Sequence, residues 1–190
     1  MNSTSIVSVI LAGILTDNIV LSKFLGIGTF FGDSKKVKNI FPISIAVTLV
    51  MILATAVTWP VYRFLLYPDF TYLETVIFVL LIVGIVWLIE WLLKKFIEPI
   101  YNTYGKYIPL VITNSAVLGV TMLNVSYELN FIGALVNAVA SGVGFMLALL
   151  LFSGVRQRIE SSDIPGFLKG LPITFVAAAI ISIAVMGLTF

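Results

Sequence analysis

The chain has 190 residues, of which 60% are hydrophobic and only 11% are charged, with a net charge of +2. Because a soluble domain carries roughly a quarter charged residues, this composition excludes a soluble fold, and the small net charge does not favour binding to nucleic acid. The chain contains no Cys and no His, so it cannot form disulfides, use thiol catalysis or build a metal site from those side chains.

Six long apolar segments follow one another, each close to the roughly 20 residues that a helix needs to cross a bilayer. Lipid leaves only helices and closed barrels as spanning structures, and the run from Ile77 to Ile89 lacks the alternating polar positions of a barrel strand. The sequence therefore predicts an all-α integral membrane protein with a single transmembrane domain. The expected spans are residues 6–31, 40–59 (closed by Pro60), 73–93, 107–123, 131–152 and 171–190.

Basic residues gather in alternate loops. The loops after the first, third and fifth spans hold nine of the 11 Lys and Arg residues, whereas the opposite loops hold only Arg63. The positive-inside rule then makes the basic loops cytoplasmic. We expect a multi-pass protein of the inner (cytoplasmic) membrane with both termini on the outer side.

The two halves of the chain show a weak internal repeat. Phe24–Gly32 is FLGIGTFFG and Val111–Gly119 is VITNSAVLG, and in each a small central residue, Gly28 or Ser115, is followed four positions later by Gly. Three spans fall in each half, which predicts two inverted three-helix repeats with the first helix of each repeat broken. The same small residues are also typical of ordinary close packing between helices. The repeats would comprise residues 1–97 and 98–190.

The first and fourth spans carry the most polar groups expected at membrane depth. Asp17, Asn18 and Lys23 interrupt the first span, and charges at depth point to a functional site because they are costly. A break in the helix would equally leave Asp17 and Lys23 solvated or paired. Thr113 and Asn114 in the fourth span would satisfy backbone groups that such a break frees.

Glu90 lies near the cytoplasmic end of the third span. It is a further candidate for an ion path. The favoured interpretation is a pair with Lys94, four residues later, at the level of the lipid headgroups.

At the two repeated motifs the chain resembles a known family. FLGIGTFFGDSKKV (Phe24–Val37) and YIPLVITNSAVLGV (Tyr107–Val120) are similar to motifs of the paired membrane subunits of the Rnf and Na+-translocating NADH:quinone oxidoreductase (Nqr) complexes. The resemblance covers nearly the whole chain and implies six helices in two inverted repeats. It also implies an ion-translocating (Na+ or H+) electron-transport complex, in which the partners are a related six-helix subunit of opposite topology and flavin-bearing and ferredoxin-like subunits.

One departure from the family pattern concerns iron. The family motifs FLGxCPF and TTNCAVLG each contain a cysteine, and four such cysteines from two related subunits resemble the ligand set of one [2Fe-2S] cluster. Here those positions are Gly28 and Ser115, and Thr29 replaces the usual Pro. A glycine offers no ligand and a serine oxygen is a poor substitute for thiolate. The resemblance therefore implies a chain that has lost the cluster or has had its cysteines replaced.

The chain alone offers no complete active site. It has no glycine-rich strand-to-helix loop for a nicotinamide or flavin, so a redox reaction would belong to the complex. Two other functions stay open on the sequence: an inverted-repeat secondary transporter, and a structural subunit without a redox role.

Overall fold

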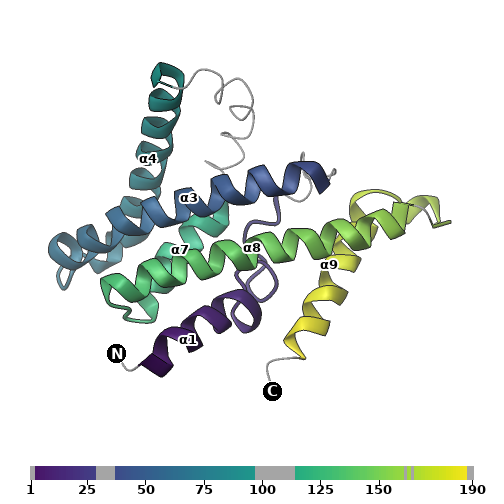
Figure 1. The fold of residues 1–190 in the computed structure, drawn as a ribbon, viewed down its shortest axis with the longest axis horizontal. Helices are drawn as coiled ribbons and strands as arrows, with labels where there is room; N and C mark the ends of the chain where they lie inside the picture. The colour runs from purple at the N-terminus through teal and green to yellow at the C-terminus, as the bar shows by residue number, and fades with distance from the viewer. Residues whose placement is uncertain (1–2, 29–36, 97–113, 161, 164, 188–190) are drawn as a thin grey trace.

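A computed structural model describes residues 3–28, 37–96, 114–160, 162–163 and 165–187 of the chain (Figure 1). The predicted all-α class is confirmed, because the described ranges contain helices and turns and no strand. The helices are α1 (Ser3–Leu11), α3 (Val37–Val61), α4 (Glu74–Phe96), α7 (Ser115–Ser126), α8 (Phe131–Glu160) and α9 (Leu171–Met186). Two π-helical turns, η1 (Ala12–Thr16) and η3 (Tyr62–Leu66), and two 3-10 turns, η4 (Thr71–Leu73) and η6 (Gly166–Leu168), adjoin them.

The two longest helices, α3 and α8, lie side by side and run in opposite directions across the molecule (Figure 1). α7 packs between them, α1 and η1 pack on α8, and α9 packs near the C-terminal end of α8. α4 contacts α3 and α7 but turns away from the long pair in this view. α8 is therefore the element against which most of the fold is assembled.

The interior is apolar and closely packed. Met51 on α3 and Phe145 and Leu149 on α8 are almost fully buried in one hydrophobic cluster. A side chain at Gly142 of α8 would overlap Thr48 of α3, so glycine at this position lets the two backbones approach closely.

Within the part of the chain that the structure describes, three helices are long and apolar enough to cross a bilayer. They cover Ile40–Leu66, Thr71–Lys95 and Phe131–Ile159, and they correspond to the second, third and fifth expected spans. The other three expected spans, 6–31, 107–123 and 171–190, each overlap only in part with a shorter apolar helix: Val7–Thr16, Ser115–Ser126 and Pro172–Val185. The six-span arrangement and the inverted repeat stay predictions.

Several helix boundaries differ from the expected ones. Pro60 does not close the second span: the helix continues past it and ends in the π turn η3, where the Tyr67 N–H donates to the Tyr62 carbonyl at 2.9 Å. A proline near a helix end removes only one helical hydrogen bond, so the last turn can still form. The fifth helix ends at Glu160 rather than 152, because a helix need not stop where its apolar run stops.

Candidate functional site

The first expected span is broken in the structure. Helix α1 passes into η1 and ends at Thr16, and the Asp17 N–H donates to the Ala12 carbonyl at 2.6 Å. The residues that follow form turns, in which Phe24 and Gly26 adopt the left-handed φ values of 56° and 80°. A break in this apolar segment was expected, and the structure confirms it after Thr16.

The buried side chain of Asn18 forms hydrogen bonds with backbone groups at this break. Its amide nitrogen donates to the Ile14 carbonyl at 2.9 Å and to the Gly144 carbonyl at 2.7 Å. Its amide oxygen accepts from the N–H groups of Val20 and Leu21 at 3.0 and 3.2 Å. All the hydrogen-bonding groups of this fully buried amide are thus engaged within the protein. Asn18 replaces the helical bonds that the backbone loses and joins the break to α8.

Glycines let η1 approach α8 closely enough for this contact. A Cβ atom at Gly144 would lie 2.5 Å from the Gly13 carbonyl oxygen and 2.9 Å from the Asn18 amide nitrogen. A Cβ atom at Gly13 would lie 3.0 Å from the Cβ of Ala140. Contacts this short leave no room for a side chain at Gly144, and only a tight one at Gly13.

Asp17 and Lys23 form a partly exposed pair at the break. Lys23 Nζ lies 3.9 Å from Asp17 Oδ1, and their side chains are 42% and 44% exposed. Tyr127, just after α7, donates its hydroxyl to Asp17 Oδ2 at 3.2 Å. Burial, the Asp17 charge and this hydrogen bond together raise the pKa of Tyr127. Asp17 and Lys23 thus lie as a partly exposed pair beside the break. Their predicted part in an ion path stays a prediction.

The second motif begins α7 and contacts the first motif. Asn114 caps α7 by accepting from the Ala116 N–H at 2.9 Å, as short polar side chains do at a helix start. Ser115 Oγ accepts from the backbone N–H of Gly26 at 2.9 Å, across 89 residues of chain. A Cβ atom at Gly26 would lie 2.9 Å from both Asn114 Oδ1 and the Ala116 Cβ. The structure therefore brings the two motifs together at a junction where only glycine fits on one side.

Gly28 and Ser115, the positions of the family cysteines, are both exposed at this junction. A Cβ atom at Gly28 would have nothing within 4 Å among the described residues. Gly28 nonetheless supplies no ligand atom, and Ser115 Oγ already accepts from Gly26. Iron–sulfur clusters are held by thiolates, and the chain has no Cys. The residues present do not fit a [2Fe-2S] cluster.

Two further residues of the predicted polar path, Glu90 and Thr113, have different outcomes. Glu90 on α4 pairs with Lys94 Nζ at 2.7 Å, so the predicted i, i+4 pair is confirmed. Thr113 lies outside the described residues, so its predicted place in a polar path stays a prediction.

A buried polar chain that the sequence analysis missed joins three helices. The Asn124 amide of α7 donates to Thr55 Oγ1 of α3 at 3.3 Å, and the Asn137 amide of α8 donates to Asn124 Oδ1 at 2.8 Å. The three side chains are at most 6% exposed. Single asparagines inside apolar spans were the available signal, because lipid-exposed amides are costly. That the two asparagines and Thr55 meet from three different helices could not be inferred from spacing.

Comparison with known proteins gives consistent matches over almost the whole chain. Residues 6–190 match the family described as Rnf-Nqr subunit, membrane protein. The chain is 41% identical over 184 residues to the A-type subunit of the Na(+)-translocating ferredoxin:NAD(+) oxidoreductase complex of Acetobacterium woodii, covering 96% of both chains. It is 38% identical over 184 residues to the A-type subunit of the proton-translocating ferredoxin:NAD(+) oxidoreductase complex of Clostridium ljungdahlii, covering 96% of this chain and 95% of the relative. It is 40% identical over 174 residues to the A-type subunit of the ion-translocating oxidoreductase complex of Azoarcus sp., covering 91% and 90%.

Proposed function

Because the chain belongs to the Rnf-Nqr family of membrane subunits, we propose that it is the A-type subunit of an ion-translocating ferredoxin:NAD+ oxidoreductase complex. The observation that carries the proposal is the end-to-end similarity to three subunits of that type. The relatives named for Na+ and for protons are almost equally similar to this chain. The proposal therefore names a monovalent cation, Na+ or H+, as the transported ion.

The junction between the two motifs suits a docking surface for a second membrane subunit. Gly28 and Ser115 are exposed there, while Gly26 and Asn114 behind them are buried and hydrogen-bonded. A surface of small residues lets another helix backbone approach closely in lipid. The partner in this proposal is a related six-helix subunit of opposite topology, with flavin-bearing and ferredoxin-like subunits completing the complex.

The proposed topology places both termini on the outer side of the inner membrane. The support is the basic loops, of which Lys94 and Lys95 end α4 and Arg156 and Arg158 lie in the last turns of α8. Reporter fusions at the two termini test this orientation, and a cytoplasmic signal from either terminus contradicts it.

The two missing cysteines favour a second candidate role, that of a subunit of the complex that takes no part in holding an iron–sulfur cluster. With Gly28 and Ser115 at those positions, the chain would keep the fold and the docking surface but hold no cluster with its partner. Iron analysis and low-temperature electron paramagnetic resonance of the dithionite-reduced complex test this role. We expect no [2Fe-2S] signal from this interface, and a signal assigned to it would contradict the role. Gly28→Cys together with Ser115→Cys should allow the signal to appear where the partner carries its own cysteines.

Purification from native membranes in mild detergent tests the proposed function. We expect the tagged chain to co-purify with other subunits of the complex. The same fractions should transfer electrons from reduced ferredoxin to NAD+. A monodisperse preparation of the chain alone, with the oxidoreductase activity in other fractions, would support the secondary-transporter alternative instead.

A further inference from the structure

A single helix-like turn follows the break in the first expected span. At its start, Asn18 accepts hydrogen bonds from the N–H groups of Val20 and Leu21. The Ser22 N–H donates to the Asn18 carbonyl at 2.8 Å, and the turn ends where the Phe24 N–H donates to the Val20 carbonyl at 3.0 Å. A bond of this span, made by a residue in the left-handed conformation, is a common way for a helix to end, and glycine is the usual residue there. Phe24 therefore occupies a position that favours glycine.

Phenylalanine is an unfavourable residue at this position. The φ of Phe24 is 56°, and in this conformation the β carbon of an L residue lies too close to the following carbonyl oxygen. Glycine has no β carbon, and the chain does use glycine at its next left-handed residue, Gly26, where φ is 80°. For a bulky residue such a backbone marks strain. The ring of Phe24 must gain a contact of its own to offset this strain.

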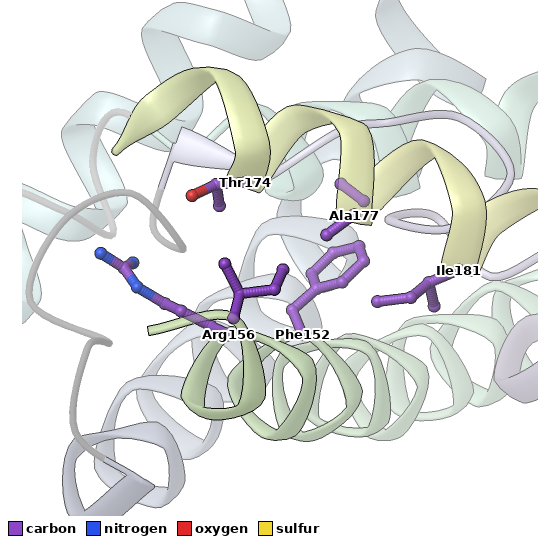
Figure 2. A pocket seen from close by; sticks show the side chains of 7 residues that line it. Phe152, Arg156, Thr174, Ala177 and Ile181 are labelled. Atoms are coloured by element: carbon purple, nitrogen blue, oxygen red, sulfur yellow. The ribbon is translucent and has the colours of Figure 1, made fainter. Parts of the chain in front are cut away.

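The Phe24 ring gains only part of such a contact inside the chain. It is 47% exposed, whereas Val20 and Leu21 in the same turn are at most 1% exposed. Phe152 on α8 shows the alternative, because it is 1% exposed and its ring lies between α8 and α9 beside Ala177 (Figure 2). A phenylalanine that serves the core is enclosed by its neighbours, and Phe24 is not enclosed.

Lipid does not supply the missing stabilisation. Phe24 belongs to the first expected span, residues 6–31. In a bilayer, an apolar side chain contacts lipid both before and after the helices pack, so this contact contributes little to the packed state. Packing against a second protein surface adds dispersion contacts that the separate chain lacks. A strained, half-exposed ring is therefore better explained by a partner protein than by lipid.

Phe24 lies next to the junction of the two motifs in the chain. Gly26, two residues later, donates its N–H to Ser115 Oγ at 2.9 Å, and Gly28 and Ser115 are both exposed. These small residues let a helix of another subunit approach the backbone closely. Aromatic side chains contribute strongly to interfaces because each buries a large apolar area. The small residues and the ring together form a surface suited to a packed helix.

We propose that Phe24 is an aromatic anchor for the related six-helix subunit, and that its ring packs on a helix of that subunit next to Gly28 and Ser115. The inference rests on the proposed function, in which this junction faces that subunit. It goes further because it assigns one side chain to a contact that the chain alone does not complete. The backbone strain at Phe24 is then offset in the complex rather than in the separate chain.

Thermal unfolding of the separate full-length chain in detergent tests the first half of the inference. Phe24→Gly should melt at the temperature of the parent or above it, because relief of the backbone offsets the loss of a half-exposed ring. Phe24→Ala loses the same ring without this relief, so it should melt about 2–4 °C below Phe24→Gly. A Phe24→Gly chain that melts clearly below the parent would overturn the inference, since the ring would then serve the core.

Dissociation of the detergent-solubilised complex on dilution, followed by native mass spectrometry, tests the second half. We expect Phe24→Gly and Phe24→Ala each to raise the dissociation constant between the chain and the related subunit about tenfold. Phe41→Ala is the matched control, because Phe41 is 49% exposed on the regular helix α3. It should change the dissociation constant by less than about twofold.

The other results of the dilution experiment contradict the inference in distinguishable ways. Equal dissociation constants for the parent and Phe24→Gly would overturn the anchor and leave the proposed function intact. An equally large loss in Phe41→Ala would show that Phe24 has no special place in the interface. A parent chain that never associates with a related subunit would overturn the proposed function as well. A homodimer of the parent chain that Phe24→Gly dissociates would make a second copy of this chain the occupant instead.

Discussion

Asn18 stabilises a broken helix with one side chain, because its amide makes four hydrogen bonds to backbone groups. Replacing it with alanine would leave carbonyl and N–H groups buried without partners. Each such group costs about 1–3 kcal/mol. We therefore expect Asn18→Ala to lower the free energy of unfolding by roughly 3 kcal/mol, measured by denaturant unfolding in detergent.

Asn130→Ala is the control for this prediction. Asn130 also accepts a backbone hydrogen bond, from the Gly133 N–H at 2.7 Å, but it is an exposed cap at the start of α8. Loss of an exposed cap costs about 1 kcal/mol. Equal destabilisation by the two replacements would show that Asn18 is only an ordinary turn residue.

Tyr127 provides a pH-dependent contact at the same break. Its raised pKa, caused first by burial and then by the Asp17 charge, keeps the hydroxyl protonated above the ordinary value of about 10. The folded state thus holds this proton more tightly than the unfolded state, so the stabilisation is complete below the unfolded pKa and is lost as the pH rises through the raised folded pKa.

Absorbance titration of tyrosinate, as the difference between the parent protein and Tyr127→Phe, measures this pKa. We expect Asp17→Asn to move the difference titration toward lower pH. An unchanged titration in Asp17→Asn would mean that the contact between Tyr127 and Asp17 does not form.

The close approach of η1 to α8 depends on the glycine at position 144 of α8. Gly144→Ala would place a methyl group against the Gly13 carbonyl and the Asn18 amide, so it should separate η1 from α8 and cost about 1–3 kcal/mol. Gly154, on the same helix, has nothing within 4 Å of an added Cβ. Gly154→Ala should therefore stabilise α8 slightly, by up to about 1 kcal/mol. Thermal unfolding of both variants measures the two changes in stability. A loss of stability in Gly154→Ala but not in Gly144→Ala would contradict the prediction.

The helices themselves could be predicted because apolar length is a strong signal. The segments around α3, α4 and α8 were found from hydrophobicity alone, and so was the polar interruption at Asp17 and Asn18. The exact end of α3 could not be found, because a proline near a helix end is compatible with both stopping and continuing. The end of α8 was missed because its last turns are polar and carry no membrane signal.

The side-chain partners at the candidate site were less predictable. The pair of Glu90 with Lys94 follows from helical spacing. The contacts of Asn18 with Gly144 and of Ser115 with Gly26 join residues 126 and 89 positions apart. Such contacts depend on how the helices pack against one another. The pattern of apolar residues does not specify this packing in a membrane protein, because apolar side chains can face either lipid or another helix.

At the scale of the whole molecule, the chain combines a hydrogen-bonded junction of its two motifs with long apolar helices that leave much side-chain surface exposed. α4 is the clearest case, with Leu80, Trp87 and Trp91 all exposed. Exposed apolar surface on a membrane helix contacts lipid or a partner subunit. This arrangement fits one component of a larger membrane complex, as the family membership of the chain requires.

Cation transport by membrane vesicles tests the central claim most directly. Inverted vesicles from cells that lack this chain would be given reduced ferredoxin and NAD+, and uptake of Na+ or H+ would be measured beside NADH formation. We predict that both activities are absent without the chain and return when it is restored. Full ferredoxin-dependent cation uptake in vesicles that lack the chain would contradict its place in the complex.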